Sequence, residues 1–383
     1  MRKSWLVWSA VVVCLLAAVR VEAADKKAKQ QKIIGGYISA GGRPLVAGSV
    51  AADKMTRINY AFFHLKGNEI VEGSARDAEN LAVLTGLKKD HPGLAVLISV
   101  GGGSGSGGFS DMALTKEGRT AFVDSAVALV EKYNLDGLDV DWEYPGYTHH
   151  NDKVRPVEDK PDYTLLLKEL RLRFNVEQKK LGRHLITSSA TGWSTEWLDH
   201  TEMREASKWL DTVNLMCYDY YRVDDHNTGH DAPLYTNPAD PKAFSTDRSV
   251  RENLAAGVPA KKLVIGVPFY GKTWKDVPAA NNGLWQPVPA PVSGTPGYGQ
   301  IAATMLGKPG WVRYWDPVAQ APYLYNAETH VFLTYDDVES EALKTKYVKD
   351  KGLAGVMFWQ YTQDPSNTLL DAIDAGLGMT PGK

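Results

Sequence analysis

Three acidic residues at alternate positions, Asp139, Asp141 and Glu143, are the side chains of this sequence best suited to catalysis. In a β-strand they share one face, about 6–7 Å apart, and the apolar residues between them occupy the other face. Mutual repulsion and partial burial should raise the pKa of at least one of them, which keeps a carboxylic acid protonated near neutral pH. Glu143, the last of the three, is best placed to protonate a substrate. A structural network of carboxylates, or a calcium or magnesium site, is the alternative.

The acidic strand is one of eight short apolar runs that alternate with segments of helical periodicity. Repeated strand-then-helix order predicts parallel βα units, and eight units predict an α/β fold, the (β/α)8 TIM barrel. The acids would then face the barrel interior and reach its C-terminal mouth. The expected strands are 32–40, 57–65, 94–101, 137–143, 184–191, 212–218, 262–270 and 352–360. The expected helices are 77–90, 116–133, 162–181, 195–209, 248–257, 338–350 and 367–375.

The connection between the seventh and eighth strands is too long, at about 80 residues, for a structureless loop. Prolines near its start and aromatic runs further on predict a small α+β insertion over 272–336. The barrel would then comprise 33–271 and 337–383. Because this connection opens on the catalytic face of a barrel, the insertion is expected to wall one side of the cleft.

The N-terminus has a basic start, an apolar run over 5–19 and two small residues, Ala23 and Ala24. This order is typical of a secretory signal peptide, and the run is too short for a membrane span. We therefore expect a signal peptide over 1–24 and a basic tail over 25–32. The mature protein would be secreted or periplasmic and would not be held in the membrane.

The composition, 44% hydrophobic and 23% charged residues in a chain of 383, is typical of a globular protein. A formal net charge of −2 argues against a nucleic-acid partner, and we expect a monomer. After cleavage only Cys217 remains, so no intramolecular disulfide can form and stability depends on the core. The 11 Trp and 18 Tyr exceed the 9 Phe, which indicates either core aromatics or surfaces on which sugars stack.

The segment 136–143, Asp-Gly-Leu-Asp-Val-Asp-Trp-Glu, resembles the strand-four signature of chitinases of glycoside hydrolase family 18. The resemblance continues from the third expected strand to the eighth and spans nearly the whole mature chain. The other matching segments are 99–102 (Ser-Val-Gly-Gly), 216–219 (Met-Cys-Tyr-Asp), 266–271 (Gly-Val-Pro-Phe-Tyr-Gly) and 355–359 (Gly-Val-Met-Phe-Trp).

This resemblance implies a chitinase that hydrolyses β-1,4 bonds of chitin or chitooligosaccharides with retention and without a cofactor or metal. It implies that the substrate's own 2-acetamido oxygen attacks the anomeric carbon, as is general for this family. Glu143 would protonate the glycosidic oxygen and later activate water. Asp141 would bind the acetamido N–H, and Asp139 would share a proton with Asp141. Tyr218 would donate its hydroxyl to the acetamido oxygen.

The resemblance also implies a set of sugar-binding residues around these acids. Asp219 would bind sugar hydroxyls, and Trp359 would form the floor of the −1 subsite. Barrel packing explains the two aromatic matches on the first strands equally well. The full expected set is Tyr37, Phe62, Gly101, Gly102, Met216, Asp219 and Trp359.

Two positions depart from the family pattern. Gly103 stands where many relatives carry a tryptophan that stacks on the leaving-group sugar, and the run 103–108 predicts a flexible loop. Lys272 stands where relatives often have arginine, which keeps the charge but loses the bidentate fork. Four other tryptophans lie in or beside the insertion, where they would line the cleft or hold the insertion together: Trp274, Trp285, Trp311 and Trp315.

Two further functions stay open on the sequence alone. An endo-β-N-acetylglucosaminidase acting on N-glycans or peptidoglycan-type chains would share the same acids. A non-catalytic sugar-binding barrel typically lacks the acid that is present here at Glu143. His149 and His150 indicate a metal only weakly, since they have no companion ligands at useful spacing. A groove walled by the insertion would favour oligomers and action at chain ends.

Overall fold

The structure, a computed structural model, describes residues 31–148 and 153–378. The chain divides into two units, 1–32 and 33–383, and the second carries everything that follows. The expected signal peptide, most of the basic tail and the pair His149 and His150 lie outside the described residues. Within the described ranges, no helix has the length and apolar character needed to cross a bilayer.

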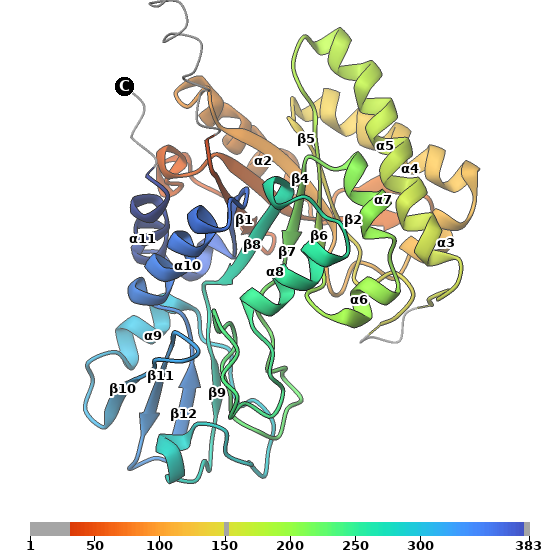
Figure 1. Ribbon diagram of the computed structural model, residues 1–383. Helices are drawn as coiled ribbons and strands as arrows, with labels where there is room; N and C mark the ends of the chain where they lie inside the picture. The colour runs from red at the N-terminus through yellow and green to blue at the C-terminus, as the bar shows by residue number, and fades with distance from the viewer. Residues whose placement is uncertain (1–30, 149–152, 379–383) are drawn as a thin grey trace, which may run out of the picture. The chain divides into compact units, whose positions relative to one another are not determined.

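Eight parallel strands form a closed barrel, because β1 pairs with both β2 and β13 (Figure 1). This arrangement confirms the predicted (β/α)8 TIM barrel. A short strand, β3 (Glu69–Val71), extends β2 in antiparallel fashion. The barrel strands are β1 (Ile33–Ser39), β2 (Arg57–Lys66), β4 (Ala95–Gly101), β5 (Gly137–Asp141), β6 (Ile186–Thr191), β7 (Thr212–Leu215), β8 (Leu263–Pro268) and β13 (Gly355–Trp359).

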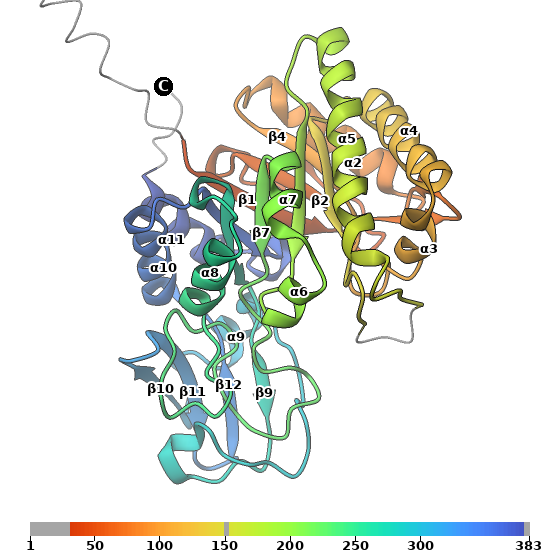
Figure 2. The same cartoon turned by 45° about the vertical axis from the view of Figure 1, so that its right-hand side comes forward.

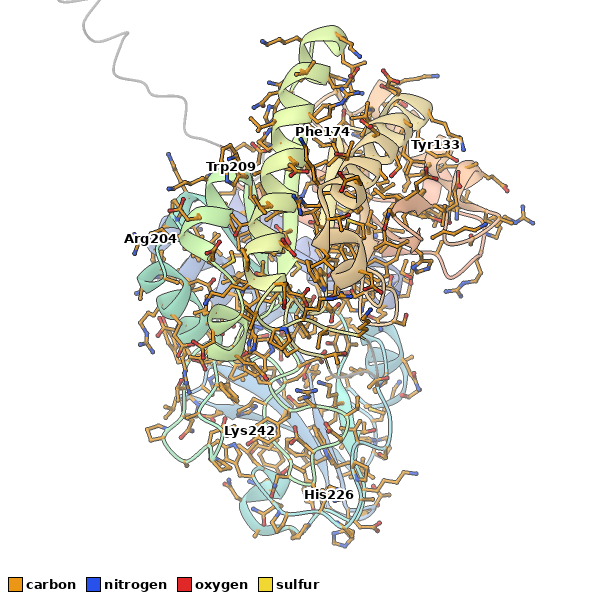
Figure 3. The ribbon with its side chains drawn as sticks, turned by 90° about the vertical axis from the view of Figure 1, so that its right-hand side faces the viewer. Tyr133, Phe174, Arg204, Trp209, His226 and Lys242 are labelled. Atoms are coloured by element: carbon orange, nitrogen blue, oxygen red, sulfur yellow. The ribbon has the colours of Figure 1, made fainter. Side chains whose placement is uncertain are left out.

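Helices follow the strands and cover the outside of the barrel (Figures 1 and 2). Two of them, α10 and α11, lie side by side in both views. The fully buried Phe174 of α5 is labelled in Figure 3, where α5 runs beside α4. The barrel helices are α2 (Asp77–Gly86), α3 (Phe109–Leu114), α4 (Lys116–Tyr133), α5 (Asp159–Leu181), α6 (Thr195–Asp199), α7 (Met203–Ala206), α8 (Thr246–Ala255), α10 (Val338–Asp350) and α11 (Thr368–Leu377).

Local signals set where these helices begin and end. The Thr115 side chain accepts a hydrogen bond from the Gly118 N–H and so caps the start of α4. Asn134 ends the same helix in the left-handed conformation, φ 53°. Asp337 starts α10 with a capping box. The single helix expected over 195–209 is instead divided into α6, α7 and a 3-10 turn.

Two catalytic strands end earlier than the sequence predicts. The alternating pattern suggested strands to Glu143 and Tyr218, but β5 ends at Asp141 and β7 at Leu215. After β7 the backbone turns tightly, because the N–H of Tyr218 donates to the carbonyl of Met216, 2.7 Å away. The side chains at the cleft therefore extend from the ends of the strands rather than from within them.

The outer face of β5 packs against helices as its alternation predicts. Leu138, Val140 and Trp142 are all buried. The Trp142 ring stacks on Phe109, with centroids 5.4 Å apart, and meets Tyr163 of α5 edge-on. This packing fixes the strand so that its other face, which carries the acids, points into the barrel.

In the sequence, the strands of a second sheet lie between β8 and β13, where the insertion is expected. Its four antiparallel strands have the order β10-β11-β12-β9. A separate apolar cluster that includes Trp274, Tyr323 and Phe332 forms its core. The elements of the insertion are β9 (Lys272–Trp274), α9 (Tyr298–Thr304), β10 (Trp311–Asp316), β11 (Ala321–Asn326) and β12 (Val331–Thr334).

Candidate active site

A cavity of about 220 Å³ opens at the C-terminal ends of the barrel strands. Eight of the residues expected at the site line this cavity, so the fold brings together residues from five different strand ends. Asp139, Gly101 and Gly102 lie behind its wall. The lining residues are Tyr37, Phe62, Gly103, Asp141, Glu143, Tyr144, Ala190, Trp193, Met216, Tyr218, Asp219, Tyr270 and Trp359.

Asp139 is fully buried beneath the cavity and accepts four hydrogen bonds. Its Oδ2 accepts from the hydroxyls of Tyr37 and Ser99, each at 2.8 Å. Its Oδ1 accepts from the Ser188 hydroxyl at 2.5 Å and from the Asn214 amide at 3.1 Å. Hydrogen bonds from four different strands therefore fix the orientation of this carboxyl group.

Asp141 and Glu143 are in surroundings that favour the protonated acid. Burial raises the pKa of Asp141 well above its ordinary value, and the charges of Glu143 and Asp139 raise it further. Burial also raises the pKa of Glu143 to about 7, although a hydrogen bond with Tyr144 lowers it. Both oxygens of Asp139 accept hydrogen bonds from other residues, and the proton sharing expected between Asp139 and Asp141 stays a prediction.

The glycine-rich run after β4 is tied to the catalytic strand, although its composition suggested a flexible loop. The Gly102 N–H donates to the Asp141 carbonyl at 2.8 Å. The Ser106 hydroxyl lies 3.0 Å from the same carbonyl and accepts from the Glu143 N–H at 2.9 Å. At Gly101, φ is 114° and a Cβ would lie 2.1 Å from the Asp141 oxygen, so only glycine fits. The loop therefore holds the backbone that carries both acids.

Aromatic side chains form one side of the cavity. Trp359 stacks on Phe62 with ring centroids 5.3 Å apart and lies 5.9 Å from Tyr37. Gly102 leaves room for this arrangement, because a Cβ there would lie 2.5 Å from the Phe62 ring. Gly103 also lines the cavity and offers no ring, as the sequence indicated.

Asp219 is held at the rim by two donors to the same oxygen. The Tyr270 hydroxyl and Lys272 Nζ donate to its Oδ1 at 2.6 and 2.5 Å, while its side chain stays about half exposed. The buried Lys272 also donates to Asp231 and to the Tyr221 carbonyl, at 2.5 and 2.6 Å. Burial opposes the charge of Lys272, but the two carboxylates outweigh it and raise its pKa. A compact ammonium with three donors meets three acceptors here, so the fork of an arginine is not needed.

Four lining residues were missed in the sequence: Tyr144, Ala190, Trp193 and Tyr270. Tyr270 belongs to the seventh-strand match, so its motif could have identified it. Trp193 follows β6, the one barrel strand after the third that carries no family motif. Its ring packs edge-on against Tyr220 and Phe244, at 4.9 and 4.5 Å. Its position at the end of β6, the strand that pairs with the acidic strand, was the available signal.

The insertion does not form a wall of this cavity, because none of the lining residues falls within 272–336. Its tryptophans are instead used for packing. Trp274 is fully buried in the insertion's own core, with Trp285 packed against it. Trp311 packs against the main core, and Trp315 lies against an arginine side chain. Within the described residues, no three His, Cys, Asp or Glu side chains are placed to hold a metal ion.

The cavity thus combines Glu143 at the mouth, with its pKa raised to about 7, and a second buried carboxyl with a raised pKa, Asp141, while Asp139 lies beneath them. Tyrosine and tryptophan side chains flank these groups. A buried acid with a pKa near 7 suits general acid catalysis, and flat aromatic rings suit sugar rings.

Comparison with known proteins agrees with this chemistry. A model described as "Glycosyl hydrolases family 18" matches residues 28–364. Chitinase A1 of Niallia circulans is 39% identical over 313 residues, which cover 78% of this chain and 45% of that protein. The chain spans about half the length of the curated relatives it matches first.

Solved structures give the same family. A family 18 N-acetylglucosaminidase from Paenibacillus barengoltzii has a TM-score of 0.85 and 41% identity, covering 90% of this chain and all of that one. Chitinase ChiA74 from Bacillus thuringiensis has a TM-score of 0.87 and 34% identity, covering 92% and 71% of the two chains. On its family match, its barrel and its acidic strand, this chain belongs to glycosyl hydrolases family 18.

Proposed function

We propose that this protein is an exported chitinase that hydrolyses β-1,4-linked N-acetylglucosamine polymers or oligomers with retention. The observation that carries the proposal is the position of Glu143 at the mouth of the cavity, with a pKa raised by burial to about 7. At neutral pH such a group is about half protonated, and its protonated form can donate to a leaving-group oxygen.

The arrangement of the acids supports attack by the substrate rather than by a protein carboxylate. Asp139, Asp141 and Glu143 extend from one strand, so they approach the sugar from the same side. The 2-acetamido oxygen would attack the anomeric carbon as Glu143 protonates the glycosidic oxygen, and an oxazolinium ion would form. Glu143 would then deprotonate the water that opens this ring, and the product would keep the β configuration.

The neighbouring residues support the closure of that ring. Asp141, at the cavity wall, would hold the acetamido N–H, and Tyr218 would donate its hydroxyl to the acetamido oxygen. Asp141 would also stabilise the positive charge that develops on the ring, and Asp139 below it would share its proton. Trp359 would form the floor beneath the sugar, and Asp219 would bind its hydroxyls through the oxygen not used by Tyr270.

Glu143→Gln tests the assignment. The amide keeps the shape but has no acidic proton, so kcat on chitotetraose should fall by about 10²–10⁴-fold while oligosaccharide affinity is retained. Glu341→Gln is a matched control, because Glu341 is also a buried carboxyl whose pKa is raised by burial, but it lies on α10. Activity in Glu143→Gln equal to that of Glu341→Gln would remove the proposal.

An N-acetylglucosaminidase that releases single sugars is a second candidate. The cavity is small, below the ~300–1,000 Å³ usual for sites that enclose a whole ligand of drug size. Gly103 also leaves the leaving-group side without a ring. Chitohexaose labelled at its reducing end separates the two. Early release of N-acetylglucosamine alone indicates the second function, whereas early dimers and trimers indicate a chitinase.

Export rests on the first 24 residues, whose pattern is that of a signal peptide. Expression of the full chain in a bacterial host should yield a mature protein that begins near Ala24 or Asp25. A protein that keeps Met1 and stays in the cell would contradict export without affecting the catalytic assignment.

A further inference from the structure

Arg57 is a buried cation inside the barrel that the reaction described above does not use. It lies on β2, is 3% exposed and points toward β7. Its Nη1 donates to the Thr212 hydroxyl at 2.8 Å and its Nη2 to Asn214 Oδ1 at 3.0 Å. Both partners are neutral, although an unpaired buried charge is costly. The structure therefore has to balance this charge at longer range.

Asn214 connects this cation to the carboxylate beneath the active site. Its carbonyl oxygen accepts from Arg57 and from the Thr212 hydroxyl, the latter at 3.1 Å. Its amide nitrogen donates to Asp139 Oδ1 at 3.1 Å and lies 3.3 Å from the Tyr37 hydroxyl. A guanidinium, an amide and a carboxylate thus form one hydrogen-bonded series, in which each bond polarises the next.

We propose that Arg57 is a positioning residue for catalysis: through Asn214 it serves as the counter-ion of Asp139 beneath Asp141 and Glu143. The inference rests on the proposed function and deepens it. It gives Arg57, which lies at the end of the barrel interior opposite the cleft, an electrostatic role in the active site.

The other charged and titratable groups around Asp139 leave this role to Arg57. Asp141 and Glu143 lie above it on its own chain segment, and both are acids. Tyr37 on β1 donates to Asp139, and burial raises the pKa of that tyrosine well above its ordinary value, so it stays neutral. Tyr163 of α5 is likewise buried and uses its hydroxyl on Ser189.

Asp211, which precedes β7, is the other acid that influences Arg57. Burial lowers the pKa of Arg57, and Asp139 makes the largest opposing contribution. Asp211 itself is paired with Arg171 and His184 at the surface. Of the acids around the buried guanidinium, Asp139 at the base of the site therefore does most to keep it charged.

The counter-ion matters for the acids above it. The charge of Asp139 raises the pKa of Asp141, and Arg57 is a buried cation that offsets this charge. Without Arg57, the charge of Asp139 would raise the pKa of Asp141 further, so the acidic limb of the activity profile would move toward neutrality.

The test measures kcat and KM on chitotetraose from pH 3 to 9 for the parent, Arg57→Met and Arg57→Lys. A bell-shaped parent profile establishes the proposed function first, so its failure is seen separately. For Arg57→Met we expect the acidic limb to move up by about one pH unit, with KM within about twofold of the parent because Arg57 does not contact the cavity. Arg57→Lys keeps the charge and should return the limb toward the parent position.

Two further variants keep the test decisive if Arg57→Met folds poorly. Asn214→Leu retains the charge but breaks the series, and it should move the same limb in the same direction. Arg119→Met removes another buried arginine, one that is bound outside the barrel interior to Glu169 and the Ala113 carbonyl. It should lower stability and leave the limb in place. The pH at which the acidic limb of the activity profile falls does not depend on how much of the protein is folded. The proposal is therefore overturned if this pH is unchanged in both Arg57→Met and Asn214→Leu.

Discussion

Three carboxyl groups carried by one strand and the residues just after it have different surroundings in this site. Asp139 has four donors, Asp141 is buried with an oxygen that no described residue binds, and Glu143 lies at the mouth with one hydrogen bond to Tyr144. The sequence could predict that three acids share a face and that one is protonated. It could not predict which, because the four donors to Asp139 come from strands far away in the chain.

The pH dependence of activity should follow Glu143. Since burial raises its pKa to about 7, the group loses its proton above that pH and can no longer act as an acid. We expect kcat/KM on chitotetraose to fall about tenfold for each pH unit above pH 7–8. A profile that stays flat to pH 9 would contradict the role of Glu143.

The same residue should affect stability in a defined direction. A glutamate whose folded pKa is raised from 4.5 to about 7 stabilises the fold below pH 4.5 relative to higher pH, and this contribution is lost as pH rises to 7. Glu143→Gln has no such proton. Relative to that of the parent, its free energy of unfolding should therefore rise by about 1–3 kcal/mol from pH 4 to pH 8. Urea titrations at the two pH values measure this. Equal pH dependence in the two proteins would show that Glu143 is not buried as described.

At the scale of elements, irregular segments help to position the catalytic acids. The alternation of side chains along a strand does not apply to the residues just after β5 or to the glycine-rich run after β4. Asp141 is the last residue of β5 and pairs only with Gly101 of β4, and Glu143 lies beyond the strand, where no neighbouring strand pairs with the chain. The glycine-rich run after β4 replaces that support through Ser106 and Gly102. The strands themselves were predictable from apolar periodicity. Their ends were not, because hydrogen bonds to loops decide where pairing stops.

Ser106→Ala tests this support. The change leaves the Glu143 N–H without its acceptor and removes one donor to the Asp141 carbonyl. We expect a loss of about 1–3 kcal/mol in stability and a fall of roughly tenfold in kcat, because a displaced acid loses reactive geometry. Ser104→Ala, in the same loop but exposed, is the control and should resemble the parent. If the two variants behave alike, the loop does not position Glu143.

At the scale of the whole molecule, Lys272 connects the insertion to the barrel. This residue begins β9 of the insertion sheet, yet its ammonium binds Asp219 at the cleft and Asp231 in the long segment after β7. The sequence identified the lysine as a departure from the family pattern but could not show its second acid. The excess of tyrosine and tryptophan is likewise divided between the site and two separate cores.

Lys272→Met should therefore affect both stability and substrate binding. It leaves a buried carboxylate without its cation, which costs about 3–5 kcal/mol in comparable buried pairs. It also removes a donor that holds Asp219, so KM should rise. Lys208→Met, which breaks an exposed pair with Glu205, is the control and should leave the unfolding midpoint nearly unchanged. A midpoint for Lys272→Met close to that of the control would show that the bridge adds little.

Retention through the substrate's acetamido group is the central claim, and the anomer of the first product tests it most directly. Proton NMR recorded within the first minutes of chitotetraose hydrolysis, before mutarotation, separates α- and β-anomers at the newly formed reducing end. The account predicts an initial excess of the β-anomer that decays toward the equilibrium mixture. An initial excess of the α-anomer would mean direct attack by water and would contradict the mechanism.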